Sequence, residues 1–384
     1  MRRSYFSMLA IGCLVVSIEA SAAAKEEHYP ISKLDYIGEY IIPNDATVDG
    51  VTVGGLSGID YDAKNKQWLM ISDDRSDKGP DRAYLGKMTI TANNVGAMTL
   101  TKMIPLLQPN GSLYPSKVAY LSDHKGVVPD FESIRFNPDT KGIRYTSEGD
   151  RSLGFSPFIR DADMDGHYLD ELPVPAAFKF DPKNKARGFY DNLAFEGSSY
   201  TPDKKAYFVA MEAPLIQDGP VPSLNKGAFS RVLRYGKNNT VLGEYVYPVD
   251  SLPAAPGAGK HADNGVSEIL AVDNQHLLVL ERAGIQDKKG HYHDYIRIYQ
   301  TDMKGATNVK GRNKLVAGQF KPMHKRLLLN LNQANLPRLD NLEGITFGPK
   351  LADGQQTLVL ISDNNFNATE VTQLFAFKVI PAHL

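Results

Sequence analysis

The chain alternates between short apolar runs and clusters of turn-forming residues. Apolar stretches such as Leu34 to Ile42 and Trp68 to Ser72 are bounded by Gly, Pro, Asp and Asn, and the chain holds 32 glycines and 23 prolines. Runs of this length between turn signals are typical of β-strands. No long stretch shows apolar residues at helical spacing. The pattern therefore predicts an all-β protein built from many short strands.

One pattern recurs five times along the chain. An acidic or hydroxyl residue opens a strand, a turn follows, and a second apolar strand runs into another acidic residue. The opening residues, Ser57, Glu132, Glu196, Glu268 and Glu343, lie 64 to 75 residues apart. The closing carboxylates are Asp73, Glu148, Glu212, Glu281 and Asp363. Two motif strands in so long a period predict radial repetition.

A β-propeller of five or six blades with an acidic central channel accommodates this pattern best. Five motif copies predict five blades, and a sixth blade without the motif is the alternative, around Ala97 to Leu107. The strand expected at Thr372 to Ile380 is predicted to close the ring by pairing with Leu34 to Ile42. The Pro-, Gly- and Ser-rich inserts at 106–125 and 219–226 are expected to cap one face.

Corresponding residues of the blades should meet near one axis, which would gather the acidic residues into one cluster. Ser57 would leave one position of that cluster uncharged. Such an array repels itself unless cations neutralise it, and oxygen ligands favour Ca²⁺ over Mg²⁺. The predicted metal ligands are Asp73, Glu132, Glu148, Glu196, Glu212, Glu268, Glu281, Glu343 and Asp363. The alternative is a structural role, with each acid tying a turn between strands.

Three arginines follow closing carboxylates: Arg75, Arg282 and, three residues after Glu148, Arg151. Guanidinium groups bind phosphate or carboxylate with two parallel hydrogen bonds, so these residues are predicted to bind an anionic substrate. Salt bridges to the neighbouring acids are the alternative.

Two other motifs favour loops over metal sites. Asp161 to Gly166 resembles the start of a calcium loop, but Leu172 stands where that loop needs a glutamate, so a polar hairpin turn is predicted. His291 to Asp294 lies in a hydrophilic stretch and is expected to be an exposed loop. The chain holds no H-E-x-x-H, P-loop, G-x-G-x-x-G or G-x-S-x-G motif.

The net charge and the first residues of the chain limit the partners and the cellular location that the protein can have. The balance of 43 basic and 44 acidic residues argues against binding to nucleic acid or to anionic membranes. No apolar run after the first residues approaches the roughly 20 residues that a membrane span needs, so no stable membrane insertion is predicted. The expected protein is a monomer with a small anionic molecule as its partner. Residues 1–22 resemble a signal peptide cleaved near Ala22, which predicts a periplasmic or secreted protein. Lipidation at Cys13, the single cysteine, is the alternative. Residues 23–384 are expected to form one propeller domain.

The repeats resemble the esterase-like phytase family of exported bacterial β-propellers. The resemblance rests on GGLSGIDYD with WLMISDDR, DFESIRF with YTSEGD, FEGSSYTPD with VAMEAP, GVSEILAV with LLVLERAG, and DNLEGITFGP with LVLISDNNF. It implies hydrolysis of phosphate esters with Ca²⁺ at an acidic face. The residues that match the family motifs are Asp73, Arg75, Glu132, Glu148, Glu196, Glu212, Glu268, Glu281, Arg282, Glu343 and Asp363.

The resulting hypothesis is an exported, calcium-dependent phosphoester hydrolase. Glu132, Glu196 and Glu343 are its predicted catalytic residues, and Arg75, Arg151 and Arg282 its predicted substrate ligands. Two alternatives stay open from the sequence. One is a lactonase or carboxylester hydrolase that needs a single catalytic metal, and the other is a binding propeller with structural calcium.

Overall fold

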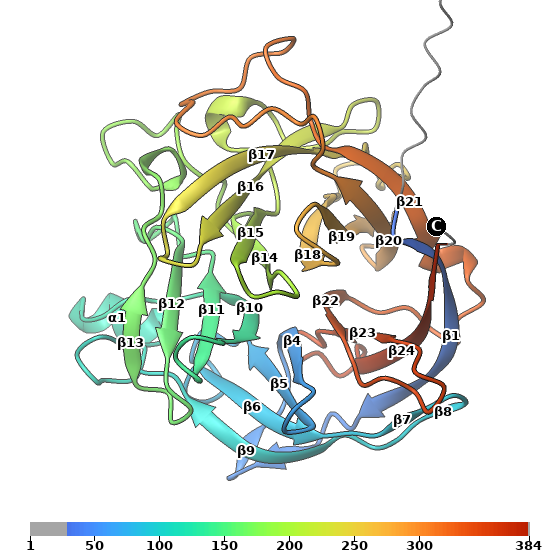
Figure 1. Ribbon diagram of the computed structural model, residues 1–384. Helices are drawn as coiled ribbons and strands as arrows, with labels where there is room; N and C mark the ends of the chain where they lie inside the picture. Colours follow the sequence, from blue (N-terminus) through green and yellow to red (C-terminus); the bar gives the residue numbers. More distant parts are fainter. Residues whose placement is uncertain (1–28, 383–384) are drawn as a thin grey trace, which may run out of the picture.

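A computed structural model describes residues 29–382, which fold into five four-stranded antiparallel sheets around one axis (Figure 1). Blade 1 contains β4 (Leu56–Asp62), β5 (Gln67–Ser72), β6 (Arg82–Lys87) and β9 (Thr99–Pro105). Blade 2 contains β10 (Phe131–Phe136), β11 (Ile143–Ser147), β12 (Phe158–Ala162) and β13 (Tyr168–Glu171). Blade 3 contains β14 (Phe195–Tyr200), β15 (Ala206–Met211), β16 (Ala228–Gly236) and β17 (Val241–Val249).

Blades 4 and 5 complete the ring. Blade 4 contains β18 (Gly265–Ala271), β19 (His276–Gln286), β20 (Tyr292–Asp302) and β21 (His324–Asn330). Blade 5 contains β22 (Leu342–Phe347), β23 (Thr357–Ser362), β24 (Thr372–Pro381) and β1 (Ile31–Ile42). The first strand of each repeat motif, β4, β10, β14, β18 or β22, lies nearest the axis (Figure 1). These five are called the inner strands.

The ring is closed by pairing the two ends of the described chain. β1 runs antiparallel to β24, with Leu34 opposite Val379 and Ile42 opposite Thr372. This closure was predicted from the sequence and is confirmed. It ties the first described strand into the last sheet, so blade 5 depends on residues more than 300 positions apart.

The structure has five blades, and the alternative of a sixth is wrong. The stretch proposed for it, around Ala97 to Leu107, forms β9, the outermost strand of blade 1. Two short ribbons lie outside the blades: β2 (Thr47–Val48) with β3 (Val51–Thr52), and β7 (Ile90–Thr91) with β8 (Asn94–Val95). One short α-helix, α1 (Lys117–Asp123), and three 3₁₀ turns, η1 (Ala176–Phe178), η2 (Ile216–Asp218) and η3 (Leu331–Gln333), complete the described elements.

Apolar side chains fill the spaces between neighbouring blades. Trp68 and Met70 of β5 pack in one cluster with Val359 and Ile361 of β23. Successive strand residues point to opposite faces of a sheet, so every second residue of a blade faces each neighbouring blade. Burial of this surface, at about 25 cal/mol per Å² of apolar area, is what holds the blades together.

The inner strands all begin at the same end of the propeller. The loops that join one blade to the next return to this end, and the loop from β9 to β10 carries α1. The predicted inserts at 106–125 and 219–226 both lie there, because each one connects strands whose ends are at that side. This end is called the loop face. Among residues 29–382, no helix has the length and apolar character that a membrane crossing requires.

Candidate metal centre

Each inner strand is interrupted near its first residues by a shift in pairing register. The shifts lie between Leu56 and Gly58, Phe131 and Ile134, Phe195 and Gly197, Val266 and Glu268, and Leu342 and Gly344. A β-bulge of this kind adds an unpaired residue and re-aims its side chain. The residues at the bulges are Ser57, Glu132, Glu196, Ser267 and Glu343. The fold thus repeats one local distortion at the loop face of all five blades.

The second strand of each blade supplies the next residue of the centre. Asp73, Glu148, Glu212 and Asp363 each directly follow the residue that pairs with the start of the inner strand. In blade 4, Glu281 pairs with Val266, so the equivalent residue is Arg282. Blades 1, 2, 3 and 5 therefore contribute a carboxylate at this position, and blade 4 contributes a guanidinium group.

This register corrects the sequence alignment of the fourth repeat, which is shifted by one residue at both positions. Glu268 lies one residue past the bulge and pairs with Arg135, with 2.7 Å between Oε2 and Nη2. Glu281 accepts hydrogen bonds from Tyr247 and Lys325. The structure therefore places both glutamates, predicted as metal ligands, in buried networks outside the acidic centre.

Three triads of carboxylates meet at the loop face, and in each triad the ligand oxygens lie within 4.8 Å of one another. The triads are Asp73 with Glu132 and Glu343, Asp130 with Glu132 and Glu148, and Glu148 with Glu196 and Glu212. Glu132 belongs to the first two and Glu148 to the last two. The three candidate cation positions therefore form one continuous row. With Asp363, these eight carboxylates are called the acid ring.

Two glycines leave room for the neighbouring carboxylates. A Cβ atom on Gly55 would lie 2.3 Å from Oδ1 of Asp73, and one on Gly265 would lie 2.4 Å from Cγ of Glu212. Both distances are shorter than any real contact. Gly55 also has a φ of 63°, in the left-handed region that glycine adopts without strain.

The carboxylates of the acid ring are buried, except for the half-buried Asp73, and they repel one another strongly. Five of the carboxyl groups have a pKa well above the usual range: Asp73, Glu132, Glu148, Glu196 and Asp363. The largest cause is loss of solvation on burial, and the second is repulsion from neighbouring carboxylates. Burial also raises the pKa of Glu212 to about 8, against the opposing effect of Arg282, and that of Asp130 to about 6, against Arg75. Burial raises the pKa of Glu343 as well.

Divalent cations fit this set of ligands. Buried polar atoms in folded proteins are almost always satisfied, yet Oε2 of Glu148 and Oδ2 of Asp363 have no hydrogen-bond partner in residues 29–382. Carboxylate oxygens are the ligands that Ca²⁺ and Mg²⁺ prefer. A cation would therefore supply the missing partner and remove the repulsion at once. The triads do not distinguish one hard cation from another.

The three predicted arginines have different surroundings. Arg75 donates to both oxygens of Asp130 and to Asn192, so it neutralises one member of the middle triad. Arg282 lies 3.3 Å from Oε1 of Glu343, and the acidic neighbours raise its already high pKa further. Its Nε is buried and has no hydrogen-bond partner among the described residues.

Arg151 does not join the acid ring. Its guanidinium group lies 5.2 Å from the ring centre of Phe180 and 5.6 Å from that of Phe189, and it donates to the carbonyl of Lys185. These residues belong to the loop between β13 and β14. The structure thus brings together two of the three arginines and seven of the nine predicted metal ligands.

Sequence reasoning missed Asp130 as a ligand. It precedes the bulge by two residues, where the other repeats carry Gly55, Ala194, Gly265 and Asn341, so comparison of the repeats offered no acidic pattern. Asn341, at the equivalent position of blade 5, donates from Nδ2 to Oε1 of Glu343 at 2.9 Å and orients it. The pairing of Asp130 with Arg75, 55 residues away in the chain, is visible only in the structure.

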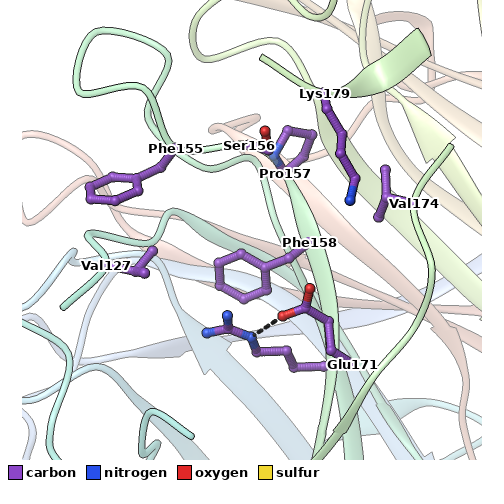
Figure 2. Close-up of a pocket in the computed structure, with 9 residues that line it drawn as sticks. Val127, Phe155, Ser156, Pro157, Phe158, Glu171, Val174 and Lys179 are labelled. Atoms are coloured by element: carbon purple, nitrogen blue, oxygen red, sulfur yellow. Dashed lines mark hydrogen bonds and ion pairs between the residues drawn. The ribbon is translucent and has the colours of Figure 1, made fainter. Parts of the chain in front are cut away.

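A partly open pocket lies beside blade 2 (Figure 2). It has a volume of about 140 Å³, and Val127, Phe155, Phe158, Val174 and Lys179 are among its lining residues. None of its lining residues belongs to the acid ring.

The polar turn predicted for Asp161 to Gly166 is confirmed at residues 163–166, whereas the loop predicted for His291 to Asp294 is wrong from Tyr292 onward, because these residues pair with β19 as the start of β20. Asp163 accepts from the backbone N–H groups of Asp165 and His167, both at 2.9 Å, and closes the turn between β12 and β13. His291 and His293 are exposed at the tip of the β19–β20 hairpin. The predicted signal peptide, including Cys13, lies outside the described residues.

Fold and site together define a class: a five-bladed β-propeller whose axis carries, at one face, a buried ring of carboxylates able to hold cations. A family model described as phytase-like, "esterase-like activity of phytase", matches residues 51–366. The chain belongs to this family, as its repeats predicted.

No curated protein matches the chain. Similar solved structures include a tail fibre of Staphylococcus aureus phage P68, with 8% identity and a TM-score of 0.34, covering 89% of this chain and 53% of that one. The chain thus spans about half the length of the phage protein. Another is a proposed oxidoreductase (glucose dehydrogenase) of Thermus thermophilus, with 14% identity and a TM-score of 0.36, covering 91% of this chain and 97% of that one. Likenesses this loose do not bear on function.

Proposed function

We propose that the chain is a hydrolase of phosphoesters that depends on divalent cations, with Ca²⁺ as the resident ion. The observation that carries this proposal is the row of three triads that share Glu132 and Glu148, with two arginines in the same ring. Family membership supports the reaction class. Bound divalent cations supply neutralising charge for a phosphoryl group and lower the pKa of a water molecule.

The residues of the ring then take separate roles. Glu343 is held by Asn341 and Arg282, so it fixes the position of the guanidinium group. Glu132 and Glu196 form no salt bridge in the described chain, which leaves their oxygens free to bind cations or to accept a proton from the attacking water. Arg282, with Nε unpartnered, is the proposed ligand of the substrate phosphate.

The test is phosphate release by the purified mature protein from phytate and from a generic phosphomonoester, with added calcium and then with a chelator. Calcium-dependent release is expected. Absence of calcium-dependent release from either substrate contradicts the proposal, and turnover of lactones in its place indicates the carboxylester alternative.

A paired substitution separates catalysis from structural calcium. Glu196→Gln removes a ring carboxylate of blade 3, and Glu244→Gln removes a buried acid of the same blade that pairs with Arg231. We expect Glu196→Gln to abolish turnover and keep the fold, whereas Glu244→Gln keeps turnover. A large fall in melting temperature on Glu196→Gln, in the presence of calcium, supports a binding propeller with structural ions.

The setting we propose for this activity is outside the cytoplasm. It rests on residues 1–22, and sequencing the amino terminus of the mature protein checks it, with a start near Ala23 expected.

A further inference from the structure

Below the acid ring, a single arginine links the five inner strands. Arg135 of β10 is buried, with 2% of its surface exposed. It donates to backbone carbonyls on the four other inner strands: from Nε to Ser198 at 2.7 Å, from Nη1 to Ile59, and from Nη2 to Ile269 at 3.2 Å and Ile345 at 3.3 Å. One side chain therefore contacts blades 1, 3, 4 and 5 from blade 2.

The four carbonyls occupy equivalent positions. Each belongs to the second residue after a bulge, at Ser57, Glu196, Ser267 or Glu343. The bulge residues carry the acid ring or stand beside it. Arg135 thus contacts each of the four remaining inner strands, two residues beyond the position that faces the candidate cations.

Glu268 completes this arrangement as the matching negative charge. Its Oε2 lies 2.7 Å from Nη2 of Arg135 and accepts from Oγ of Ser133 at 2.9 Å. Its Oε1 accepts from the backbone N–H of Ser198 at 2.6 Å and of Ile269 at 3.0 Å. Both oxygens are therefore satisfied by groups from three different blades.

Small residues around the axis make room for this pair. The positions equivalent to Glu268 are Gly58, Ser133, Gly197 and Gly344. A Cβ atom on Gly58 would lie 2.5 Å from the carbonyl oxygen of Glu132, and one on Gly197 would lie 2.7 Å from the backbone nitrogen of Ile269. The inner strands approach too closely here for a second long side chain.

We infer that Arg135 and Glu268 are positioning residues that set the geometry of the acid ring. The inference rests on the proposed function in one respect, namely that the ring binds cations. Because Glu132 and Glu148 each serve two triads, a shift of one inner strand disturbs more than one cation position. A displacement of about 1 Å is enough to spoil a preorganised site.

The test compares two buried arginines of blade 2. Arg135→Met removes the central contacts. The matched control is Arg144→Met, because Arg144 also forms a buried bidentate pair, with Asp161 at 2.6 and 2.7 Å, but donates to no inner-strand carbonyl. Both variants should melt at lower temperature than the unaltered protein.

Calcium titration by calorimetry separates the two variants. We expect the dissociation constant of Arg135→Met to rise at least tenfold or its number of bound ions to fall, and that of Arg144→Met to stay within twofold of the unaltered protein. The inference is overturned if folded Arg135→Met binds calcium with a dissociation constant within twofold of that of the unaltered protein. Whatever the melting temperature of the variant, that result would show that Arg135 contributes to stability alone.

Arg135→Lys decides the question if Arg135→Met does not fold. Lysine keeps the charge beside Glu268, but its single ammonium group cannot reach four carbonyls around the axis. The same tenfold loss of calcium affinity is expected, and unchanged affinity overturns the inference.

A separate readout keeps this test distinct from that of the proposed function. If the unaltered protein binds no calcium and releases no phosphate, the proposed function fails. Amide hydrogen exchange then decides the positioning role. We expect Arg135→Met to raise exchange at least tenfold relative to Arg144→Met in β4, β14, β18 and β22 together, whereas a change confined to β10 and β11 overturns it.

Discussion

Two levels of the same axis treat charge in opposite ways. At the loop face, eight carboxylates gather against Arg75 and Arg282, and one oxygen of Glu148 and one of Asp363 have no partner among the described residues. Deeper along the axis, one carboxylate, Glu268, meets one guanidinium group and three further donors. The five inner strands pass through both levels, and the second strands of four blades add Asp73, Glu148, Glu212 and Asp363 to the upper one.

The difference shows what distinguishes a site from a structural network. A buried charge is tolerated only when it is paired and hydrogen-bonded. Where the chain supplies its own counter-charge, the network is complete and positions the strands. Where the chain leaves the charge unmatched, an external cation has a place to bind. The comparison therefore assigns structure to the lower level and chemistry to the upper one.

The largest expected effect is on turnover, at one of the two carboxylates that belong to two triads. Glu132→Gln removes one ligand from two triads at once. We expect phosphate release to fall at least about 100-fold, roughly 3 kcal/mol of barrier. In chelator the melting temperature should hold or rise, because one source of repulsion is gone. Turnover that survives this change would place the chemistry elsewhere.

Glu268→Gln should have the opposite effect on stability. It leaves the buried Arg135 without its counter-charge, and breaking a buried ion pair costs about 3 kcal/mol. Urea unfolding in chelator measures the loss. If Glu132→Gln and Glu268→Gln change the free energy of unfolding with the same sign and size, the distinction between the two levels is wrong.

Chelation and pH provide a third way to sharpen the comparison. Folding raises the pKa of the ring carboxylates, to about 8 for Glu212 and about 6 for Asp130. A raised carboxyl pKa stabilises the fold below the unfolded value, near 4, and this stability is lost as pH rises through the folded pKa. The metal-free protein should therefore melt at lower temperature at pH 8 than at pH 5.

Calcium should reverse this trend, because it binds the ionised form. At a concentration 100 times its dissociation constant, the ion adds about 2.7 kcal/mol of stability. Melting curves at both pH values, with calcium and with chelator, check the prediction. A metal-free protein that is most stable at pH 8 would contradict the unmatched charge of the ring.

The smallest expected effect is on substrate affinity. Arg282→Gln should raise KM for phosphorylated substrates about tenfold, or 1.4 kcal/mol, and tighten calcium binding because a competing cation leaves the ring. Arg151→Gln is the matched control, since its side chain packs on Phe180 and Phe189. Its KM should stay within twofold. Equal effects of the two substitutions would remove Arg282 from the proposed substrate site.

The repeats predicted most of the architecture. Paired apolar strands that end in an acidic residue recur in all five blades, with Ser57 opening the first pair and a glutamate the other four. The expected closure through Thr372 to Ile380 is confirmed. These features are local, because strand periodicity and turns depend on residues that are close together in the sequence. The same local pattern correctly selected Glu132, Glu148, Glu196 and Glu343 as members of the triads.

The fourth repeat shows where local patterns fail. Its acids, Glu268 and Glu281, stand one residue away from the positions that face the ring, and Ser267 and Arg282 occupy those positions. A shift of one residue turns a side chain to the other face of a strand. The bulge that sets this register depends on backbone pairing, which similarity between the repeats does not specify.

Neighbouring residues therefore encode the strands, their repetition as blades and the supply of carboxylates, whereas strand pairing decides between five and six blades. Tertiary structure decides which of those carboxylates remain without a counter-charge. Arg135 comes from one repeat, yet it neutralises Glu268 of another and contacts the backbones of four. Burial and pairing depend on distances in space. Glu268 and Glu343 thus have similar sequence contexts, yet Glu268 lies in a closed hydrogen-bond network and Glu343 lies in the candidate metal centre.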